Sequence, residues 1–64
     1  MKLKIEIVMD NAAFKEADEG AEVARILTYL ARVIEIGNLG MSPGAQMPLR
    51  DFNGNACGKA KVTR

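Results

Sequence analysis

The 64-residue sequence has no histidine, no tryptophan and a single cysteine, Cys57. One cysteine cannot form an internal disulfide, and without histidine the mixed Cys/His ligand sets of structural zinc sites are excluded. A cysteine nucleophile also needs a base to activate it, and Ser42 stands alone in a loop-like segment. We therefore expect a non-enzymatic protein without a metal or cofactor, in which Cys57 is a small outward-facing residue rather than a reactive thiol.

Net charge and long apolar runs are also lacking. Nine basic and eight acidic side chains leave a formal charge of +1, so the total charge favours neither nucleic acid nor an anionic membrane as a partner. No run approaches the roughly 18 apolar residues of a membrane span, and the interrupted apolar pattern at the N-terminus does not match a signal peptide. A free cysteine also suits a reducing compartment, so we expect a cytoplasmic protein.

The small size has a consequence for assembly. A domain of this length buries only about 60% of the surface of its unfolded chain, and such domains usually need a disulfide, a metal or a partner chain. The first two are not expected here, and the 48% apolar composition is ample for a folded core. The sequence therefore predicts a homodimer, formed through an open sheet face, a sheet edge or a helix surface.

The longest periodic segment spans residues 20–37 and predicts a helix. Its apolar residues fall on one stripe of a helix with 3.6 residues per turn. Asp18 or Gly20 can cap the N-terminus, and Gly37 suits the left-handed position after the last turn. The stripe consists of Val23, Ile26, Leu27, Leu30, Val33 and Ile34.

A second stripe on the same helix carries two arginines and two large side chains. Glu22–Arg25 and Arg32–Glu35 are spaced for i,i+3 ion pairs. The stripe could bind a partner protein or stack on a base, but scattered exposed apolar residues are normal, and we favour a solvated face. Its members are Arg25, Tyr29, Arg32 and Ile36.

Three strands complete the predicted fold. Residues 2–9 alternate between apolar and polar side chains, which is typical of a half-buried strand, and Asn53-Gly54 predicts a type I′ hairpin with a two-residue loop. This loop pairs Arg50 with Cys57, Leu49 with Gly58, Pro48 with Lys59 and Met47 with Ala60.

Pro48 cannot donate to a strand ladder, so its strand should lie at an edge and the last strand should pair with the first. Phe14 should close one end of the core. The expected fold is α+β: a β-α-β-β order in which one helix packs on one face of a three-stranded sheet. The predicted core contains Leu3, Ile5, Ile7, Val23, Ile26, Leu27, Leu30, Ile34, Leu49 and Val62.

Two segments imitate functional motifs but fail their patterns. Residues 54–59 look like a phosphate-binding loop, but only three residues separate the glycines and no Ser or Thr follows the lysine. Asp51, Asn53 and Asn55 imitate the first ligands of a calcium loop, which then lacks its glycine and its bidentate glutamate. Hairpin formation explains both segments, and helix capping explains the acidic residues Glu16, Asp18, Glu19 and Glu22.

The predicted register places several basic side chains on the outer face of the sheet. Such a surface could neutralise phosphates of a nucleic acid or nucleotide, with a phenylalanine at the hairpin tip for stacking. Lysines on sheets also protect against aggregation, and we favour that role. This candidate basic face consists of Lys2, Lys4, Arg50, Phe52, Lys59 and Lys61.

Three segments carry a resemblance to known proteins: MDNAAF at residues 9–14, EVARIL at residues 22–27, and LRD followed by NGN and a glycine at residues 49–58. Together they resemble a family of short, uncharacterised phage and prophage proteins. The shared motifs are structural and include no catalytic residue. The resemblance implies a phage-encoded accessory protein that acts as a small protein-interaction module, with a host factor or a phage protein as its partner.

Overall fold

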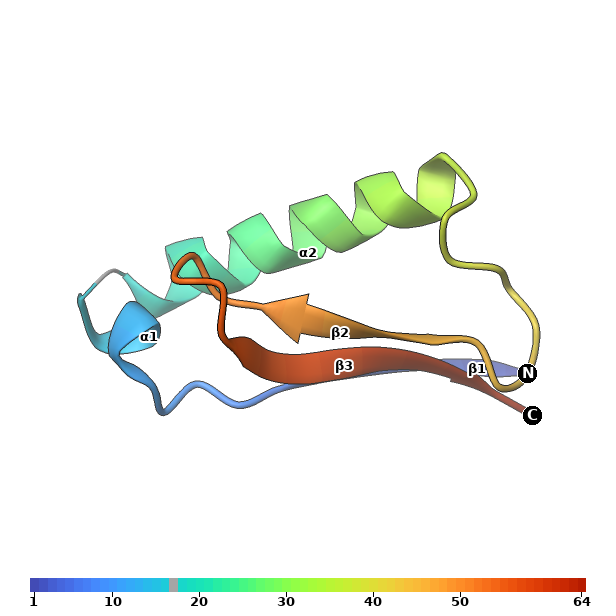
Figure 1. Ribbon diagram of the computed structural model, residues 1–64, viewed down its shortest axis with the longest axis horizontal. Coiled ribbons are helices and arrows are strands. Elements are labelled where there is room, and N and C mark those ends of the chain that lie inside the picture. The colour runs from blue at the N-terminus through green and yellow to red at the C-terminus, as the bar shows by residue number, and fades with distance from the viewer. Residues whose placement is uncertain (17) are drawn as a thin grey trace.

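The computed structural model describes residues 1–16 and 18–64, which form one layer of sheet and one layer of helix (Figure 1). The order of elements is strand, short helix, long helix, strand, strand, so the predicted α+β class is confirmed. The elements are β1 (Lys2–Ile7), α1 (Ala12–Glu16), α2 (Glu19–Glu35), β2 (Gln46–Arg50) and β3 (Ala56–Thr63).

The three strands form an antiparallel sheet in the order β1-β3-β2, which confirms that the last strand pairs with the first. Cross-strand partners of β1 and β3 include Leu3 with Val62 and Ile5 with Ala60. Gly58 lies opposite Ile7, and a Cβ atom built there would overlap the backbone carbonyl of Glu6. Only glycine therefore allows β1 and β3 to approach this closely at that point.

The position of Pro48 at an edge is also confirmed. Val62 donates from its backbone N to Ala45 O at 2.8 Å and accepts from Gly44 N at 2.9 Å, so the even-numbered residues of β3 direct their backbone groups toward β2. Pro48 is paired with the odd-numbered Lys59, so its nitrogen faces the open side of β2. No ladder hydrogen bond is lost there.

Helix α2 begins and ends with the local signals that the sequence carries. The Asp18 carboxylate accepts a hydrogen bond from Gly20 N at 2.9 Å, which makes Asp18 the N-cap. At the other end, Gly37 has φ +84°; its N–H donates to Ile34 O and Asn38 N donates to Val33 O. This is the Schellman pattern, in which a left-handed glycine closes the last turn.

Helix α1 was not expected from the sequence, because five residues are too few to show a helical period. One turn of helix at Ala12–Glu16 turns Ala13 and Phe14 into the interior, where both are fully buried. The predicted role of Phe14 at one end of the core is therefore confirmed. The core consists of Ala13, Phe14, Ile26, Leu30, Leu39, Leu49, Cys57, Ala60 and Val62.

The β2–β3 hairpin differs from the predicted type I′ turn. Gly54 has φ +85°, but no non-glycine residue described has positive φ, so Asn53 cannot occupy a type I′ position. Gly54 N donates to Asp51 O and Asp51 N donates to Asn55 O, both at 2.9 Å, which closes a three-residue loop. Three-residue loops commonly combine a type I turn with a left-handed glycine.

The longer loop brings a β-bulge with it. The pairs from Met47 to Leu49 match the predicted register, but Arg50 pairs with Ala56 instead of Cys57. Cys57 is thus the extra residue of the bulge, and its side chain is buried rather than outward-facing. Its thiol lies 3.5 Å from Leu49 O.

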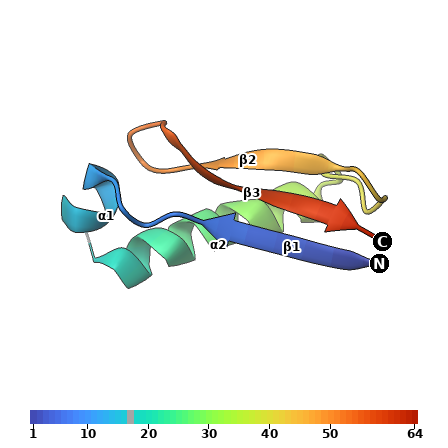
Figure 2. The same cartoon turned by 90° about the horizontal axis from the view of Figure 1, so that it is seen from below.

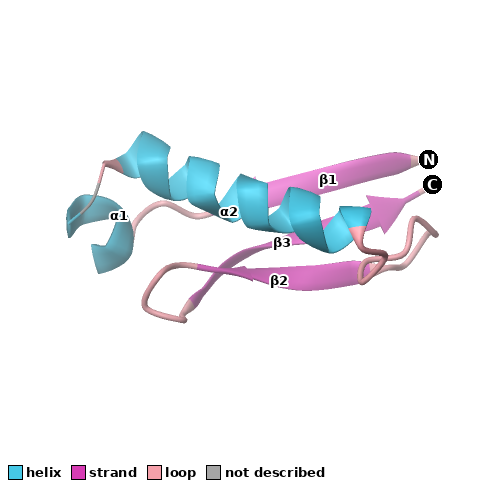
Figure 3. Ribbon diagram, turned by 90° about the horizontal axis from the view of Figure 1, so that it is seen from above, coloured by secondary structure: helices cyan, strands magenta, loops and turns pink. Residues whose placement is uncertain are grey.

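Helix α2 runs diagonally over the sheet, with its C-terminal end displaced toward β2, and leaves the N-terminal half of β1 uncovered (Figures 2 and 3). Consequently Leu3 and Ile5 are 42% and 43% exposed, although both lie on the helix side of the sheet opposite Val62 and Ala60. Leu27 is 40% exposed. The predicted placement of these three side chains in the core is therefore wrong. Ile26, Leu30, Leu49 and Val62 are buried as expected, and Ile7, Val23 and Ile34 are partly buried and pack against the core.

Candidate functional site

Helix α2 lies on one side of the sheet and leaves the other side open (Figure 1). The cross-strand pairs place a group of lysines on this outer face. Lys4 lies directly opposite Lys61, and Lys59 lies between Glu6 on β1 and Pro48 on β2. Within residues 1–16 and 18–64, neither Lys4 nor Lys61 is within 4.0 Å of a carboxylate oxygen. Like charges placed opposite one another across strands are unfavourable, so this pair is not there for stability.

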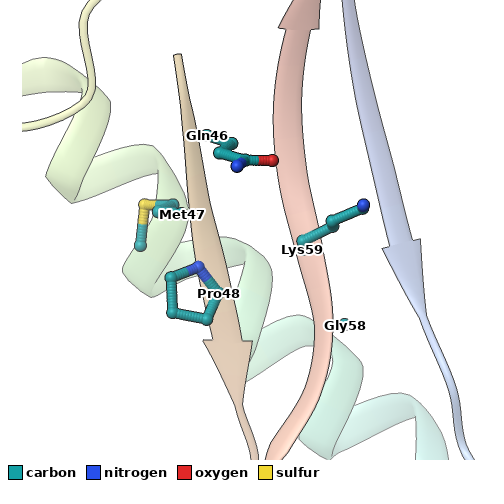
Figure 4. Close-up of a pocket in the computed structure, with 5 residues that line it drawn as sticks. All are labelled: Gln46, Met47, Pro48, Gly58 and Lys59. Atoms are coloured by element: carbon teal, nitrogen blue, oxygen red, sulfur yellow. The ribbon is translucent and has the colours of Figure 1, made fainter. Parts of the chain in front are cut away.

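Two open hollows lie beside these lysines. The larger, about 490 Å³, is lined by Gln46, Met47, Pro48, Gly58 and Lys59 (Figure 4). In it, Lys59 extends from β3 toward β1, and Gln46 extends from β2 toward β3. The second, about 310 Å³, is lined by residues of β1 and β3: Lys4, Ile5, Glu6, Lys59 and Lys61.

The remaining members of the candidate basic face are not gathered with the lysines. Arg50 donates from Nη1 to Gly54 O at 3.1 Å, which draws its guanidinium to the hairpin loop. Phe52 is 50% exposed in that loop, beyond the end of β2. The structure therefore brings together Lys2, Lys4, Lys59 and Lys61 on two neighbouring strands, with Arg50 and Phe52 at the hairpin end.

The second stripe of α2 divides into two parts. Arg25 and Tyr29 line a groove of about 310 Å³ between the helix and β2. Arg32 and Ile36 do not line it, and both are well exposed. The β2 side of the groove is formed by Met47, Pro48, Leu49, Arg50 and Asp51.

A buried carboxylate fixes one end of this groove. Glu22 is 4% exposed and accepts two hydrogen bonds from Arg25, at 2.7 and 3.1 Å, and one from Phe52 N at 2.8 Å. Arg25 also donates to Arg50 O at 3.1 Å. The hydrogen bonds from the Arg25 guanidinium hold the pKa of Glu22 below its usual value, because they favour the charged form.

The predicted i,i+3 pair of Glu22 and Arg25 therefore does more than stabilise the helix surface. It joins the first turns of α2 to the hairpin. The predicted pair of Arg32 and Glu35 is also present, at 3.8 Å, but both side chains are largely exposed. Surface pairs of that kind contribute little.

A second buried carboxylate, Asp51, organises the hairpin loop. Its Oδ1 accepts from Asn53 N at 2.9 Å and from Asn55 N at 3.0 Å, and its Oδ2 accepts from Asn11 Nδ2 at 2.7 Å. The residues that imitate a calcium loop thus close the turn, in agreement with the prediction that hairpin formation explains this segment. The link to Asn11 was not foreseen, since only the fold brings these two residues together.

Cys57 is buried beneath this network, and burial raises the pKa of its thiol. A buried cysteine with a raised pKa is a poor nucleophile, because the thiolate is the reactive form. Among the residues that the structure describes, no group of three or more Asp, Glu or Cys side chains is arranged to hold a metal ion. In the same residues, no helix is long and apolar enough to cross a membrane.

A further surface comes from the side chains that α2 leaves uncovered. Leu27 is two positions from both Arg25 and Tyr29, which places it roughly 200° away around the helix. Since those two residues face β2, Leu27 lies on the flank nearer β1, where Leu3 and Ile5 are also exposed. We refer to Leu3, Ile5 and Leu27 as the uncovered apolar strip.

Sequence reasoning could not find this strip, because the apolar pattern marks these residues as core. They are exposed because α2 runs diagonally over the sheet.

Comparison with known proteins identifies no family: no family model, no curated protein and no solved structure matches the chain.

Proposed function

We propose that this chain is a non-enzymatic protein-interaction module that acts as a homodimer. The observation that supports the proposal is the uncovered apolar strip, where three large aliphatic side chains of a 64-residue chain stay about 40% exposed although they belong to the apolar pattern of the core. Contiguous exposed apolar side chains are typical of surfaces that bind protein.

The groove between α2 and β2 is the surface we assign to a partner protein. It combines an exposed tyrosine, a proline and a methionine with the fixed Arg25 guanidinium at one end. Tyrosine and arginine are the residue types that most often dominate binding energy at interfaces. The Arg25 side chain is already oriented by Glu22, so binding there costs little additional conformational entropy.

The resemblance to phage and prophage proteins supports a setting for this activity. In it, the chain is a phage-encoded accessory protein in the cytoplasm of its host, and the partner is a host or phage protein. A free cysteine is compatible with that reducing compartment.

A pull-down from a host lysate tests the proposal. We expect the wild-type chain to retain a defined protein and the Tyr29→Ala variant to lose it. Thr28→Ala is the matched control, since Thr28 is exposed on the same helix but does not line the groove. Equal retention by all three chains, or no retention by any, would argue against the groove as a binding site.

The outer lysines support a second candidate function, which is binding of nucleic acid or a nucleotide. The supporting observation is the Lys4–Lys61 pair, in which two cations lie opposite one another. A bound phosphate would reduce their repulsion by placing a negative charge between them. Protein–nucleic acid contacts of this type weaken steeply as salt is raised.

Filter binding with single-stranded and duplex oligonucleotides at low salt tests this second function. We expect the protein to retain oligonucleotides with a dissociation constant in the micromolar range. The double change Lys59→Glu with Lys61→Glu should abolish this binding. Lys15→Glu is the control, because Lys15 lies on α1, away from the sheet. Lys15→Glu changes the net charge half as much as the double variant does. If it lowers the binding free energy by half as much or more, the effect depends only on total charge, and the outer face is removed as a site.

A further inference from the structure

The open edge of β1 is the part of the molecule best prepared to bind a second copy of this chain. Val8 N donates to Cys57 O at 2.7 Å, in continuation of the β1–β3 register. Even-numbered residues of β1 therefore direct their backbone groups to β3, and the backbone groups of Leu3, Ile5 and Ile7 face outward. An edge strand of this kind is a template for another strand.

The other edge of the sheet is protected. On β2, Pro48 presents a nitrogen without hydrogen to the open side, and a bulge interrupts the pairing of β2 with β3 between Leu49 and Arg50. Both features hinder the addition of a strand. β1 has neither proline, glycine nor bulge over its six residues.

We propose that two copies pair through their β1 strands, antiparallel, with Ile5 of one copy opposite Ile5 of the other. In this register Lys4 of each copy lies opposite Glu6 of the other, so the twofold axis generates two attractive charge pairs. Leu3 lies opposite Ile7 of the second copy. The outward-facing backbone groups of Leu3, Ile5 and Ile7 are those that this register joins.

Neighbouring registers are less favourable. A shift by two residues in one direction places Lys4 opposite Lys4 on the twofold axis, although Lys2 then lies opposite Glu6. A shift by two in the other direction places Glu6 opposite Glu6. In both cases like charges repel on the axis, and the register centred on Ile5 has no such pair. A shift by one residue puts the apolar side chains of one copy on the face that carries the lysines of the other. Charge complementarity thus selects the register centred on Ile5.

The pairing also explains why the uncovered apolar strip lies where it does. A twofold axis perpendicular to the sheet keeps both α2 helices on the same face of a continuous six-stranded sheet. The half of β1 that α2 leaves uncovered (Figure 3) then lies in the middle of that face, between the two helices. There Leu3, Ile5 and Leu27 of one copy meet those of the other, and their remaining exposed area is buried.

The inference specifies the interface of the proposed homodimer and leaves the α2–β2 groove free. It is tested by charge reversal at Lys4 and Glu6, both exposed, with the mass measured by light scattering after size exclusion. We expect wild type at twice 6.9 kDa. We expect Lys4→Glu and Glu6→Lys each to raise the dissociation constant about tenfold or more, because each replaces two attractive pairs by two repulsive ones.

Mixing the Lys4→Glu and Glu6→Lys variants should restore a dimer, because the acidic pair of one chain then lies opposite the basic pair of the other. The double variant should form a dimer by itself, because its exchanged charges are again complementary. Lys4→Glu has a second signature: it replaces the Lys4–Lys61 repulsion within one chain by an attraction, so the monomer should melt at a higher temperature while the dimer weakens. If Lys4 acted only on the folding of the monomer, Lys4→Glu would change the melting temperature of the monomer and the stability of the dimer in the same direction.

A wild-type dimer that persists unchanged in both single variants would overturn the β1 interface and leave the homodimer intact. A wild-type monomer at hundreds of micromolar would overturn both. Neither result bears on the partner groove, which the Tyr29→Ala pull-down tests separately.

Discussion

Individual residues in this chain are constrained mainly where backbones approach closely or where carboxylates are buried. Gly58 is the clearest case of close approach, because the backbone of Glu6 and Ile7 in the neighbouring strand β1 occupies the space that a Cβ atom at this position would need. Glu22 and Asp51 are the buried carboxylates, and each accepts three hydrogen bonds. Such carboxylates connect elements that the sequence separates, which makes their loss costly.

For Gly58→Ala we expect a loss of about 1–3 kcal/mol in the free energy of unfolding, since the added methyl group forces β1 and β3 apart. Urea unfolding monitored by circular dichroism measures this loss. Gly40→Ala is the matched control, because a Cβ atom at Gly40 meets no atom within 4 Å. Equal stability of the two variants would contradict the close approach.

The buried Glu22 carboxylate predicts a pH dependence of stability. Its pKa is lowered in the folded state, so its contribution is fully present above the pKa of an unfolded glutamate, about 4.3, and is lost as the pH falls through the folded value. Thermal melts of wild type and Glu22→Gln should therefore differ most near neutral pH and converge in acid.

Glu35→Gln is the control for this experiment, since Glu35 forms only an exposed pair with Arg32. We expect its melting temperature to follow that of wild type across the same pH range. A constant difference between wild type and Glu22→Gln from neutral to acid pH would show that the charge of Glu22 has no part in stability.

At the scale of elements, the diagonal path of α2 divides its apolar stripe into buried and exposed members. Ile26 and Leu30 are 1% and 2% exposed, whereas Leu27, adjacent in sequence to Ile26, is 40% exposed. Helix α1 contributes as well, because Phe14 fills the end of the core where the sheet stops. One turn of helix therefore supplies a large fully buried side chain.

This division predicts unequal costs for two otherwise identical substitutions. Leu30→Ala should destabilise the fold by about 2–5 kcal/mol, because it leaves a cavity in a packed core. Leu27→Ala should cost only about 1 kcal/mol in the monomer, since its side chain is partly solvated in the folded state. Denaturant titrations at low protein concentration measure both, and similar losses would mean that α2 packs differently.

The whole molecule is thin for its length, with extents of 35 × 20 × 17 Å. Its radius of gyration is 12.0 Å, against about 11 Å expected for a compact chain of this size. Its accessible surface of 4314 Å² likewise exceeds the roughly 4,000 Å² expected from its mass. One helix on one side of a three-stranded sheet leaves surface that a second copy can bury.

If the chain is a homodimer, its stability must depend on its own concentration. We expect the melting temperature of wild type to rise over a hundredfold increase in concentration, and that of Lys4→Glu to stay nearly constant. Differential scanning fluorimetry with an external dye measures both. A wild-type melting temperature independent of concentration would indicate that the monomer alone accounts for its stability.

Several features of this protein follow from the sequence alone because they depend on interactions between near neighbours. Asp18 and Gly37 bound α2 through contacts within one turn, and the apolar period identifies the helix itself. Pro48 and the alternating pattern of residues 2–9 determine the strand order, since they restrict which edges can be paired.

Other features were decided only by the tertiary structure. The three-residue loop at Asp51 and its bulge turn Cys57 inward, which a two-residue turn could not do. The apolar pattern gives each strand and helix a buried side but not the angle at which they cross. That angle results from packing across both layers, and it leaves Leu3, Ile5 and Leu27 at the surface where we place the second copy.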